Sequence, residues 1–441
     1  MNNPIKMPYW RLLLMNFGFF GIQHGFSIQF AKMSVIYEKL GASTEQIPGL
    51  WLAAPVTGLL IQPLIGYFSD RTWLGPFGRR RPYFFLGSVF AAIAMFCMPN
   101  VNTVWMAAAL LWVLDASINV SMQPFRAFVA DNLSSEQLAQ GYSLQTLMIG
   151  LGGLIGYWIS SVDWLKMLPF LTKIGPSSLH IQFYLCAVIY FVSVLVTVLT
   201  TGEKAPEPES TENQASHLPV IQKNWLADTW DTIKQTPDAM KELAIIQLFT
   251  WLGLFCMWIY YSVAIAHSVF GASDPHSLQY DKGVEAASNA MMIYQAISTV
   301  FALVLPFFSR KIGNVPLYTV GLLAAAVGLL TIPYFHTPAT MWIPMIGVGI
   351  GWAVILSMPY AILVDHLPAS RYGLYMGIFN LFVVFPEILS SVGLGWLMKT
   401  FLHNDHMMAI TLGGACMLVA AVLTVRLRRF SKPPEGQLQQ A

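Results

Sequence analysis

Charged residues are scarce in this chain: only 10% of its 441 residues are Asp, Glu, Lys or Arg, whereas 56% are hydrophobic. A water-soluble protein of this length could not bury so much apolar surface, so lipid must be the solvent for most of it. The net charge of +2 is too small to indicate nucleic acid as a partner. The composition therefore predicts an integral membrane protein.

Cysteine is also rare, and the known signatures of catalysis are missing. The four cysteines, Cys97, Cys186, Cys256 and Cys416, lie in apolar runs without metal-ligand spacing, so we expect free buried thiols and neither disulfides nor a metal site. The sequence contains no HExxH motif, phosphate-binding loop or paired catalytic carboxylates. We therefore expect neither an enzyme nor a bound cofactor.

Apolar runs long enough to cross a bilayer are abundant, and a polar break divides them into two groups of six. The first run lacks a small-residue cleavage site, which favours a membrane helix over a removed signal peptide. The pattern predicts an all-α polytopic membrane protein with twelve transmembrane helices in two six-helix bundles. The runs lie near residues 10–32, 47–68, 83–100, 103–128, 143–162 and 181–201, and near 243–269, 286–308, 315–335, 341–364, 372–398 and 406–425.

The polar break divides the chain into parts. Residues 1–201 are expected to form the N-terminal bundle, 202–241 a cytoplasmic linker, 242–426 the C-terminal bundle and 427–441 a cytoplasmic tail. The linker opens with GEKAPEPESTENQAS, which cannot form a core and is expected to be disordered. Its second half, residues 219–240, places tryptophans among charged residues, a pattern typical of an amphipathic helix on a membrane surface.

The distribution of Lys and Arg predicts the orientation in the membrane. If both termini are cytoplasmic, the inner side receives seventeen of these residues and the outer side six, with every Arg of the loops inside. The positive-inside rule favours this topology. Four glycines in the fifth span, Gly150, Gly152, Gly153 and Gly156, follow no strand, so they indicate close helix packing and not a phosphate-binding loop.

The two halves of the chain resemble each other in one short motif. Ser121–Phe125 (SMQPF) is followed by Asp131, and Ser357–Tyr360 (SMPY) is followed by Asp365. Such an echo between two six-helix units is typical of a transporter whose site lies between the repeats near the membrane midplane. Arg126 has no counterpart in the second half, and a residue needed only for packing would more plausibly recur.

A polar stripe runs along the fourth apolar segment. On an α-helix, Asp115, Asn119, Gln123 and Arg126 fall within about 80° of one another and share one face. A carboxylate at mid-membrane costs roughly 2.5 to 3.5 kcal/mol on insertion scales, so it must be sheltered in a hydrated cavity or paired. The functional interpretation is a central cavity, and the alternative is a polar contact between helices.

A short loop between the second and third spans carries a cluster of charges. Its sequence, GYFSDRTWLGPFGRRRPYF, places Asp70 near several arginines. These charges either retain the loop in the cytoplasm or latch the inner ends of helices by ion pairs. For the latch we predict a cytoplasmic gate formed by Asp70, Arg71, Arg79, Arg80 and Asp131.

This loop resembles the signature of the major facilitator superfamily, and its RRRP version is similar to the sucrose-proton symporters of plants and their animal and bacterial relatives, of the glycoside-pentoside-hexuronide type. The resemblance extends over most of the chain. In the fourth span, five residues stand at the family's spacing: Asp115, Asn119, Pro124, Arg126 and Asp131. Three further stretches are similar to the family: APVTGL (Ala54–Leu59), SMPYAIL (Ser357–Leu363) and GIFNLFVVFPEILSS (Gly377–Ser391).

The resemblance implies the major facilitator fold and proton-coupled disaccharide uptake, with the charged residues of the fourth span involved in coupling and sugar binding. It places the protein in the plasma (inner) membrane. The chain departs from the plant pattern in its first outer loop, LGASTEQIPGLW, which lacks the histidine found there. Position 387 is Glu where the plant symporters usually have Gln. The missing histidine weakens the expectation of sucrose, and Glu387 adds a second possible protonation site. The resemblance to bacterial relatives described as maltose or general α-glucoside carriers makes maltose a candidate.

We predict that Asp115 or Glu387 carries the proton, because removal from water favours the neutral form of a carboxylic acid. Arg126 lies about 16 Å from Asp115 along an ideal helix, too far for a direct pair, so it is expected to donate hydrogen bonds to sugar or to another carboxylate. Sugars require amides and aromatic faces. Further substrate-binding candidates are Asn119, Gln123, Gln23, His24, Trp258, Tyr260, Tyr261, Tyr294, Gln295, Trp352, Tyr360 and Asn380.

Several alternatives remain open from the residues alone. His24 serves either the cavity or packing, and any single aromatic residue can equally face lipid. Sodium coupling, facilitated diffusion and export compete with proton-coupled import. A membrane-embedded enzyme or a receptor is a competing class, but neither requires the repeat. The expected partners are a sugar, protons and the lipid bilayer, without nucleic acid, and we expect a monomer.

Overall fold

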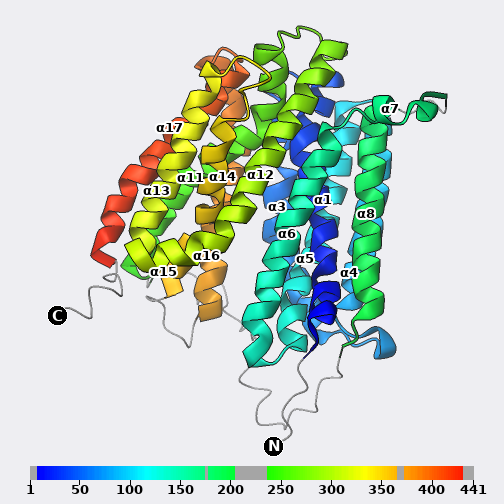
Figure 1. The fold of residues 1–441 in the computed structure, drawn as a ribbon, viewed down its shortest axis with the longest axis vertical. Coiled ribbons are helices and arrows are strands. Elements are labelled where there is room, and N and C mark those ends of the chain that lie inside the picture. Colours follow the sequence, from blue (N-terminus) through cyan, green and yellow to red (C-terminus); the bar gives the residue numbers. More distant parts are fainter. Residues whose placement is uncertain (1–6, 174–176, 204–235, 365–371, 431–441) are drawn as a thin grey trace, which may run out of the picture.

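The computed structural model describes residues 7–173, 177–203, 236–364 and 372–430. Within these ranges the chain is helical, without strands (Figure 1). The first half contains α1 (Tyr9–Lys39), α2 (Ile47–Leu50), α3 (Ala53–Arg71), α4 (Arg81–Cys97), α5 (Val104–Asn132), α6 (Ser135–Ser161), α7 (Trp164–Met167) and α8 (Ser178–Thr200). The second half contains α11 (Asp238–Ala264), a π-helical turn (Ile265–Val269), α12 (Leu278–Ile312), α13 (Asn314–Thr331), α14 (Pro344–Ile355), α15 (Met358–Val364), α16 (Tyr372–Thr400) and α17 (His406–Leu423).

The twelve predicted spans are present as two sets of six, because α2 with α3 and α14 with α15 each form one crossing. Among the described residues, ten helical segments are long and apolar enough to cross a membrane by length and composition. The other two crossings are α1 and α6, which have 31 and 27 residues but a more polar sequence. In α1 the polar residues Asn16, Ser27 and Gln29 are buried against protein, so lipid does not meet them.

Each half is held together by its own helix contacts. In the first half α1 packs against α6 and α8, and α4 packs against α5 and α8; in the second, α11 packs against α16 and α17, and α13 against α14 and α17. The halves meet along α6 and α12, with further contacts of α1 with α11 and of α16 with α2 and α3. This arrangement is the two-bundle fold expected from the sequence. Most of the predicted linker, residues 204–235, lies outside the described part, as does most of the predicted amphipathic helix. The predicted end of the linker at residue 241 falls inside α11, which begins at Asp238.

Glycines allow the closest helix crossings. A Cβ added to Gly152 would lie 2.3 Å from the carbonyl oxygen of Phe20, and one added to Gly156 would lie 2.7 Å from the Cβ of Ser27. No side chain fits at these distances, so α1 and α6 approach each other backbone to backbone. The close packing predicted from the glycines of the fifth span is confirmed.

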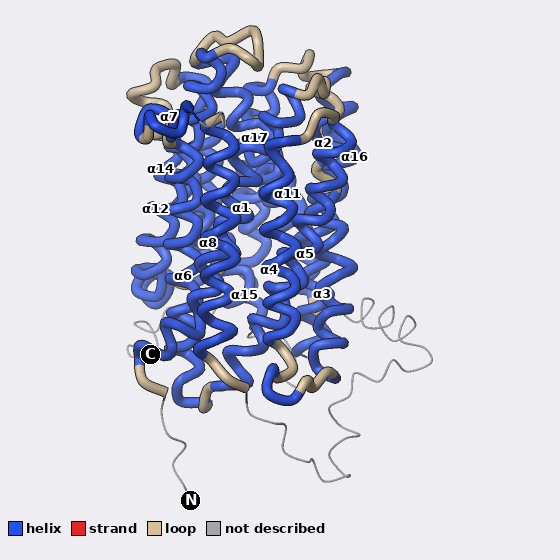
Figure 2. The backbone as a smooth tube through the Cα atoms, turned by 90° about the vertical axis from the view of Figure 1, so that its right-hand side faces the viewer, coloured by secondary structure: helices blue, strands red, loops and turns tan. Residues whose placement is uncertain are grey.

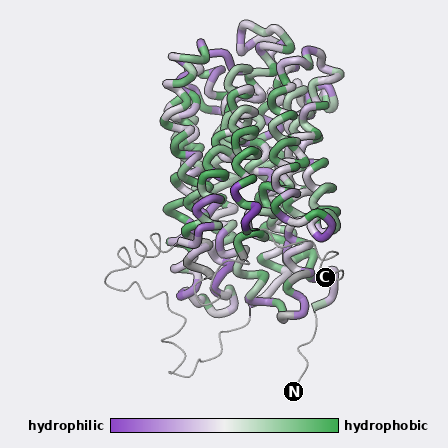
Figure 3. Tube along the Cα trace, turned by 90° about the vertical axis from the view of Figure 1, so that its left-hand side faces the viewer, coloured by the Kyte–Doolittle hydropathy of each residue, from purple (hydrophilic) through white to green (hydrophobic). Residues whose placement is uncertain are grey.

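Both termini leave the bundle at the same end (Figure 2). We call this the termini end, and the opposite end, where α1 finishes at Lys39, the far end. Hydrophobic residues extend over the length of the bundle, whereas hydrophilic segments are more frequent toward the termini end (Figure 3). The hydrophobic residues along the length of the bundle suit a protein whose helices are surrounded by lipid.

Candidate functional site

A cavity of about 610 Å³ lies between the two halves. Four helices of the first half, α1, α3, α5 and α6, and four of the second, α11, α12, α14 and α16, contribute its walls. Because the walls come from both halves, any movement of one half against the other changes the shape and accessibility of the cavity.

The cavity opens toward the termini end. Lining residues on that side are exposed, with Leu303 of α12 70% and Leu356 after α14 45% accessible. Lining residues on the far side are closed in, with Ser27 2%, Trp258 5% and Tyr294 2% accessible. The structure therefore has one open and one closed side.

Asp115 is the acidic residue that the first half contributes to the cavity wall. It is 1% exposed, and its Oδ1 accepts a hydrogen bond of 2.9 Å from Nε2 of Gln29 on α1. Its Oδ2 has no hydrogen-bond partner among the described residues. A buried carboxylate oxygen without a donor is costly as an anion and is relieved when it binds a proton or a hydroxyl group.

One helical turn below Asp115, three polar side chains form a chain of hydrogen bonds. The amide of Asn119 donates to the Asp115 carbonyl at 2.9 Å and to the hydroxyl of Thr57 at 3.3 Å. Its Oδ1 accepts from Nε2 of Gln62 on α3 at 2.7 Å. Asn119 and Gln62 both line the cavity. The chain holds two amides in defined orientations, as a site for hydroxyl groups requires.

Glu387 and Asn380 on α16 line the same cavity from the second half. Asp115 and Glu387 thus come from different halves, and each is held in place by its own bundle. The amides Gln23 of α1 and Gln295 of α12 also line the cavity. Two acids and several amides converge on one space, although they are far apart in the sequence.

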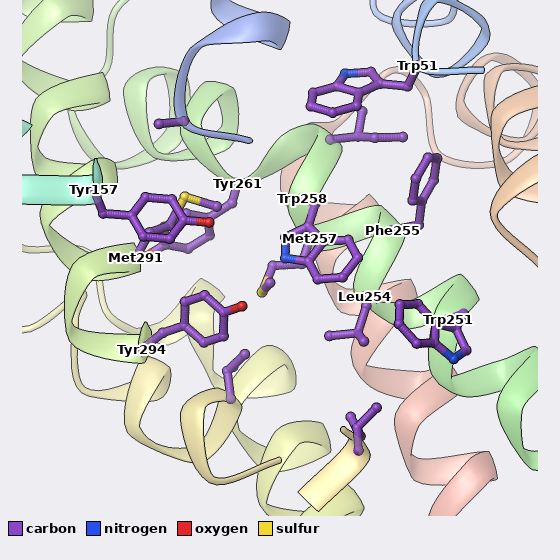
Figure 4. Close-up of a cluster of buried hydrophobic side chains, with 14 of the residues drawn as sticks. Trp51, Tyr157, Trp251, Leu254, Phe255, Met257, Trp258, Tyr261, Met291 and Tyr294 are labelled. Atoms are coloured by element: carbon purple, nitrogen blue, oxygen red, sulfur yellow. The ribbon is translucent and has the colours of Figure 1, made fainter. Parts of the chain in front are cut away.

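Aromatic side chains, most of them from the second half, form another part of the cavity wall. The ring of Trp258 lies 4.8 Å from that of Phe30, nearly parallel, and 5.3 Å from that of Trp352, perpendicular. Trp251 is 6.1 Å from Trp258, and its indole N–H lacks a partner among the described residues. Figure 4 shows Trp251 and Trp258 on α11, with Tyr294 of α12 across from them. Flat apolar faces beside amides suit a ligand with apolar faces and hydroxyl edges.

Nine residues predicted from the sequence line the cavity: Asp115, Glu387, Asn119, Gln23, Trp258, Tyr294, Gln295, Trp352 and Asn380. The others lie elsewhere. His24 is fully buried, with Nδ1 2.8 Å from the carbonyl oxygen of Phe20 on its own helix, and Tyr261 is fully buried in α11. Gln123 lies against Gly66. Tyr360 of α15 is 39% exposed and contacts the ring of Phe379 at 5.2 Å. For Arg126 the structure describes the backbone in α5 but not the side chain.

Several lining residues were missed or undervalued by sequence reasoning. Gln62, Ser298 and Thr299 were not predicted, although all three line the cavity. Gln62 precedes a proline inside an apolar helix, so its polarity at membrane depth was a usable signal. Ser298 and Thr299 carried no such signal, because hydroxyl groups can bond to their own helix backbone; Thr299 does so, donating to the Gln295 carbonyl at 2.8 Å.

A cluster of charges at the termini end joins the predicted gate residues. Arg80 is 5% exposed and donates to Asp131 at 3.0 Å and to Ser69 at 2.7 Å, and its Nη2 lies 2.5 Å from Asp70. Arg79 pairs with Asp131 at 2.8 Å. All of these residues belong to the first half, so the cluster braces α3, α4 and α5 and does not cross between the halves.

Arg71 lies apart from this cluster. Its guanidinium covers the ring of Tyr67 at 3.6 Å, and Nη1 donates to the Tyr67 carbonyl at 3.3 Å. A carboxylate that sequence reasoning missed takes a neighbouring position: Glu203, with a side chain 3% exposed, accepts the backbone N–H groups of Arg79, Arg80 and Arg81, each at 3.0 Å. Glu203 thereby caps the first turn of α4.

No group of three or more His, Cys, Asp or Glu residues that could hold a metal ion occurs within the described ranges. In the same ranges the four cysteines are free; Cys186 and Cys256 are buried, but Cys97 is exposed and Cys416 half-buried, so the expectation of buried thiols is wrong for these two. The residues that line the cavity offer proton exchange at carboxylates, hydrogen bonding at amides and stacking on aromatic faces.

Comparisons with known proteins agree with this architecture. Residues 14–391 match the family model described as Major Facilitator Superfamily. The chain is 26% identical to the sucrose transport protein SUT2 of rice, Oryza sativa subsp. indica, over 88% of this chain and 87% of that protein, and 23% identical to the sucrose transport protein SUC4 of Arabidopsis thaliana, over 94% and 89%.

Solved structures share the fold at low identity. The crystal structure of the nucleoside transporter NupG superposes with a TM-score of 0.70 at 16% identity, covering 95% of this chain and 99% of that one. A structure described as a proton-dependent oligopeptide transporter gives a TM-score of 0.69 at 12% identity, covering 96% and 99%.

Proposed function

The chain belongs to the major facilitator superfamily, and from that premise we propose that it imports a disaccharide of the α-glucoside class, such as maltose or sucrose, together with protons. Family membership makes the chain a membrane transporter and not an enzyme. The observation that carries the proposal is the cavity itself, in which Asp115 and Glu387 face a shared space from opposite halves. Transport follows when the two halves rock about this space and expose it to each side in turn.

The contents of the cavity support a sugar as substrate. Asn119 and Gln62 present oriented amides to hydroxyl groups, while Trp251, Trp258 and Trp352 present flat faces to the apolar face of a pyranose ring. The curated relatives named above are sucrose transport proteins. Arg126 is proposed to donate fixed hydrogen bonds to sugar or to a carboxylate, because it stays charged at all working pH values.

Proton coupling is assigned to Asp115. Its Oδ2 has no partner in the described part of the chain, so a proton there removes an uncompensated buried charge. In the protonated form the acid can also donate to a sugar hydroxyl. Glu387 is the second candidate, because it lines the same cavity from the other half. Coupling arises when sugar and proton are bound together before the halves move.

The orientation follows from the distribution of Lys and Arg. We propose that the termini end is cytoplasmic and that the protein lies in the plasma (inner) membrane as a monomer, with two bundles, residues 1–201 and 242–426, joined by the linker 202–241. The cavity then faces the cytoplasm in this structure. The cluster of Asp70, Arg79, Arg80 and Asp131 would serve as the cytoplasmic gate by holding the ends of α3, α4 and α5 as one body.

The test is uptake of labelled maltose and of labelled sucrose into proteoliposomes with an imposed pH gradient, acidic on the outside, with and without a proton uncoupler. Accumulation that requires the gradient and collapses with the uncoupler is the expected result. A competition panel with trehalose and monosaccharides then ranks the substrates.

Other outcomes identify the competing functions. Accumulation driven by a sodium gradient alone would assign sodium coupling. Equilibration without accumulation under either gradient would assign facilitated diffusion, and gradient-driven loss from preloaded vesicles would assign export. Absence of uptake of every sugar in the panel would overturn the assignment of the substrate class.

A further inference from the structure

A second group of charged side chains closes the far end, away from the cavity residues that the proposed function uses. His267 lies in the π-helical turn after α11, a rare geometry that is frequent at functional sites. Its Nε2 is 2.7 Å from Oε1 of Glu38 on α1, and its Nδ1 is 2.5 Å from the carbonyl oxygen of Ala272. Glu38 belongs to the first half and His267 to the second, so this contact joins the halves.

The partners of His267 determine how many protons the pair holds. A carbonyl oxygen can only accept, so Nδ1 must carry a hydrogen to bond Ala272. Nε2 faces a carboxyl oxygen, so either Nε2 carries a second hydrogen or Glu38 carries one and donates it. The other carboxyl oxygen, Oε2, accepts from the hydroxyl of Tyr280 on α12. In both arrangements the Glu38–His267 pair holds one proton more than a neutral imidazole beside a carboxylate.

Loss of that proton breaks the contact. A neutral imidazole has one N–H, so it must leave either the Ala272 carbonyl or the Glu38 carboxylate facing a nitrogen lone pair. One hydrogen bond would then become a repulsive contact between two acceptors. The closed arrangement seen in the structure is therefore available only while the extra proton is bound.

The surrounding groups form the rest of the closure. The pairs and stacking partners around His267 and Glu38 come from α1, α11, α12, α17 and the loop after α1. Lys39 is 2.5 Å from Asp281, His406 stacks on His267 at 5.3 Å, and Thr44 contacts His406 at 3.2 Å. Other charged or titratable groups of these elements near this end are Lys32, Glu45, Tyr260, Tyr280, Glu285 and Asp405.

We call the contacts of Glu38, Lys39 and Thr44 with His267, Asp281 and His406 the far-end gate. We propose that Glu38 and His267 form a proton-binding site in this gate, separate from the acids of the cavity, and that the gate closes only with a proton bound there. Proton release favours opening of the far end. The site would make closure of that end depend on proton availability, whatever the transported molecule is.

Two substitutions at Glu38 separate the proton from the packing. Glu38→Gln supplies an amide N–H₂ that can donate to the Nε2 lone pair of neutral His267, while its oxygen still accepts from Tyr280. This variant reproduces the proton-bound geometry without a proton. Glu38→Ala removes both bonds. His276→Gln is the matched control, because His276 is exposed in the loop that follows the π-helical turn and takes no part in the pair.

Access to the cavity from each side reports the state of the gate. In a background with the four cysteines replaced by serine, Ser27→Cys places a thiol in the far part of the cavity. A membrane-impermeant maleimide is applied to intact cells and to inverted membrane vesicles, so that one preparation exposes the far end and the other the termini end. Labelling is measured from about pH 6 to about pH 10 and corrected for thiolate formation with a free-thiol standard.

With Glu38 and His267 intact, labelling from the far end should rise about tenfold as the pH increases, because one charge-assisted hydrogen bond is lost. Labelling from the termini end should fall in parallel. Glu38→Gln should label slowly from the far end at every pH, and Glu38→Ala rapidly at every pH, while His276→Gln should follow the parent. The same pH dependence in the parent and in Glu38→Gln, or no pH dependence in the parent, would overturn the proposal.

Discussion

Replacing Asp115 by asparagine gives the sharpest test of the coupling mechanism, because the two side chains have nearly the same shape. The asparagine Oδ1 can still accept from Gln29 at the position where Asp115 does so at 2.9 Å. The new N–H₂ group takes the place of Oδ2, which has no partner in the described structure. Residue 115 lines the cavity in both cases. The change therefore removes the proton-binding group and keeps the packing.

The structure allows the effect on stability to be worked out. A hydrogen bond to an ionised group contributes about 1.5 to 3 kcal/mol and a neutral one about 0.5 to 1.5, so the bond with Gln29 weakens by about 1 kcal/mol. Against this, a carboxylate at mid-membrane costs roughly 2.5 to 3.5 kcal/mol that an amide largely avoids. The free energy of unfolding of Asp115→Asn should be unchanged or higher by up to about 2 kcal/mol, which thermal unfolding in detergent can measure.

The effect on transport is thermodynamic and larger. With one proton per sugar, a pH gradient of one unit supplies about 1.36 kcal/mol, which supports about tenfold accumulation. Without a bound proton the gradient does no work, so Asp115→Asn should bring sugar only to equal concentrations, while exchange of sugar for sugar continues. Asp274→Asn makes the same chemical change at an exposed loop position and should accumulate like the parent.

The assay is the proteoliposome uptake described above, with protein amounts matched by immunoblot. Full gradient-driven accumulation by Asp115→Asn would refute the assignment of the proton to Asp115. Glu387→Gln, measured beside it, would then show whether the other acid of the cavity carries the proton.

Three further outcomes follow from the geometry. Asn119→Ala and Gln62→Ala should each raise the KM for sugar. Because the two side chains share a hydrogen bond of 2.7 Å, the double variant should raise the KM by less than the product of the two single fold-changes, with a coupling energy of about 0.5 to 3 kcal/mol. Strictly additive free-energy changes in the uptake kinetics would contradict this. Gly152→Val should lower the unfolding temperature, because overpacking against α1 reduces the free energy of unfolding by about 1 to 3 kcal/mol. Gly202 has open space around it, so Gly202→Val should leave the unfolding temperature unchanged. Arg80→Lys should slow transport with sugar binding unchanged in an equilibrium binding assay, because an ammonium cannot reach Asp70, Ser69 and Asp131 together; normal turnover would exclude a gating role for the cluster.

The helices of this protein were predictable because their signals are local. Apolar runs, the Lys and Arg bias and the short echo between halves together indicate twelve spans in two bundles, and the described structure contains them. The difference at α1 and α6 is instructive: these crossings are more polar than the rest because their side chains meet protein and the cavity instead of lipid. Polarity in a span therefore indicated where the site lies.

The stripe on α5 was partly predictable for the same reason. Helical periodicity places Asp115, Asn119 and Gln123 on one face, and the first two line the cavity. The third does not: one turn nearer the termini end, Gln123 lies against Gly66 of α3. Periodicity defines a face of a helix but not which neighbour covers each turn of it.

Partners far apart in sequence were decided only by the tertiary structure. Gln29 and Asp115 are 86 residues apart, Gln62 and Asn119 57, and Glu38 and His267 229. No local pattern encodes these pairs, because they depend on how rigid helices pack and on which bundle faces which. The sequence by itself determined that lipid is the solvent, how often the chain crosses it and which residues are too polar to face it. Packing decided which of those residues share a cavity and which close its far end.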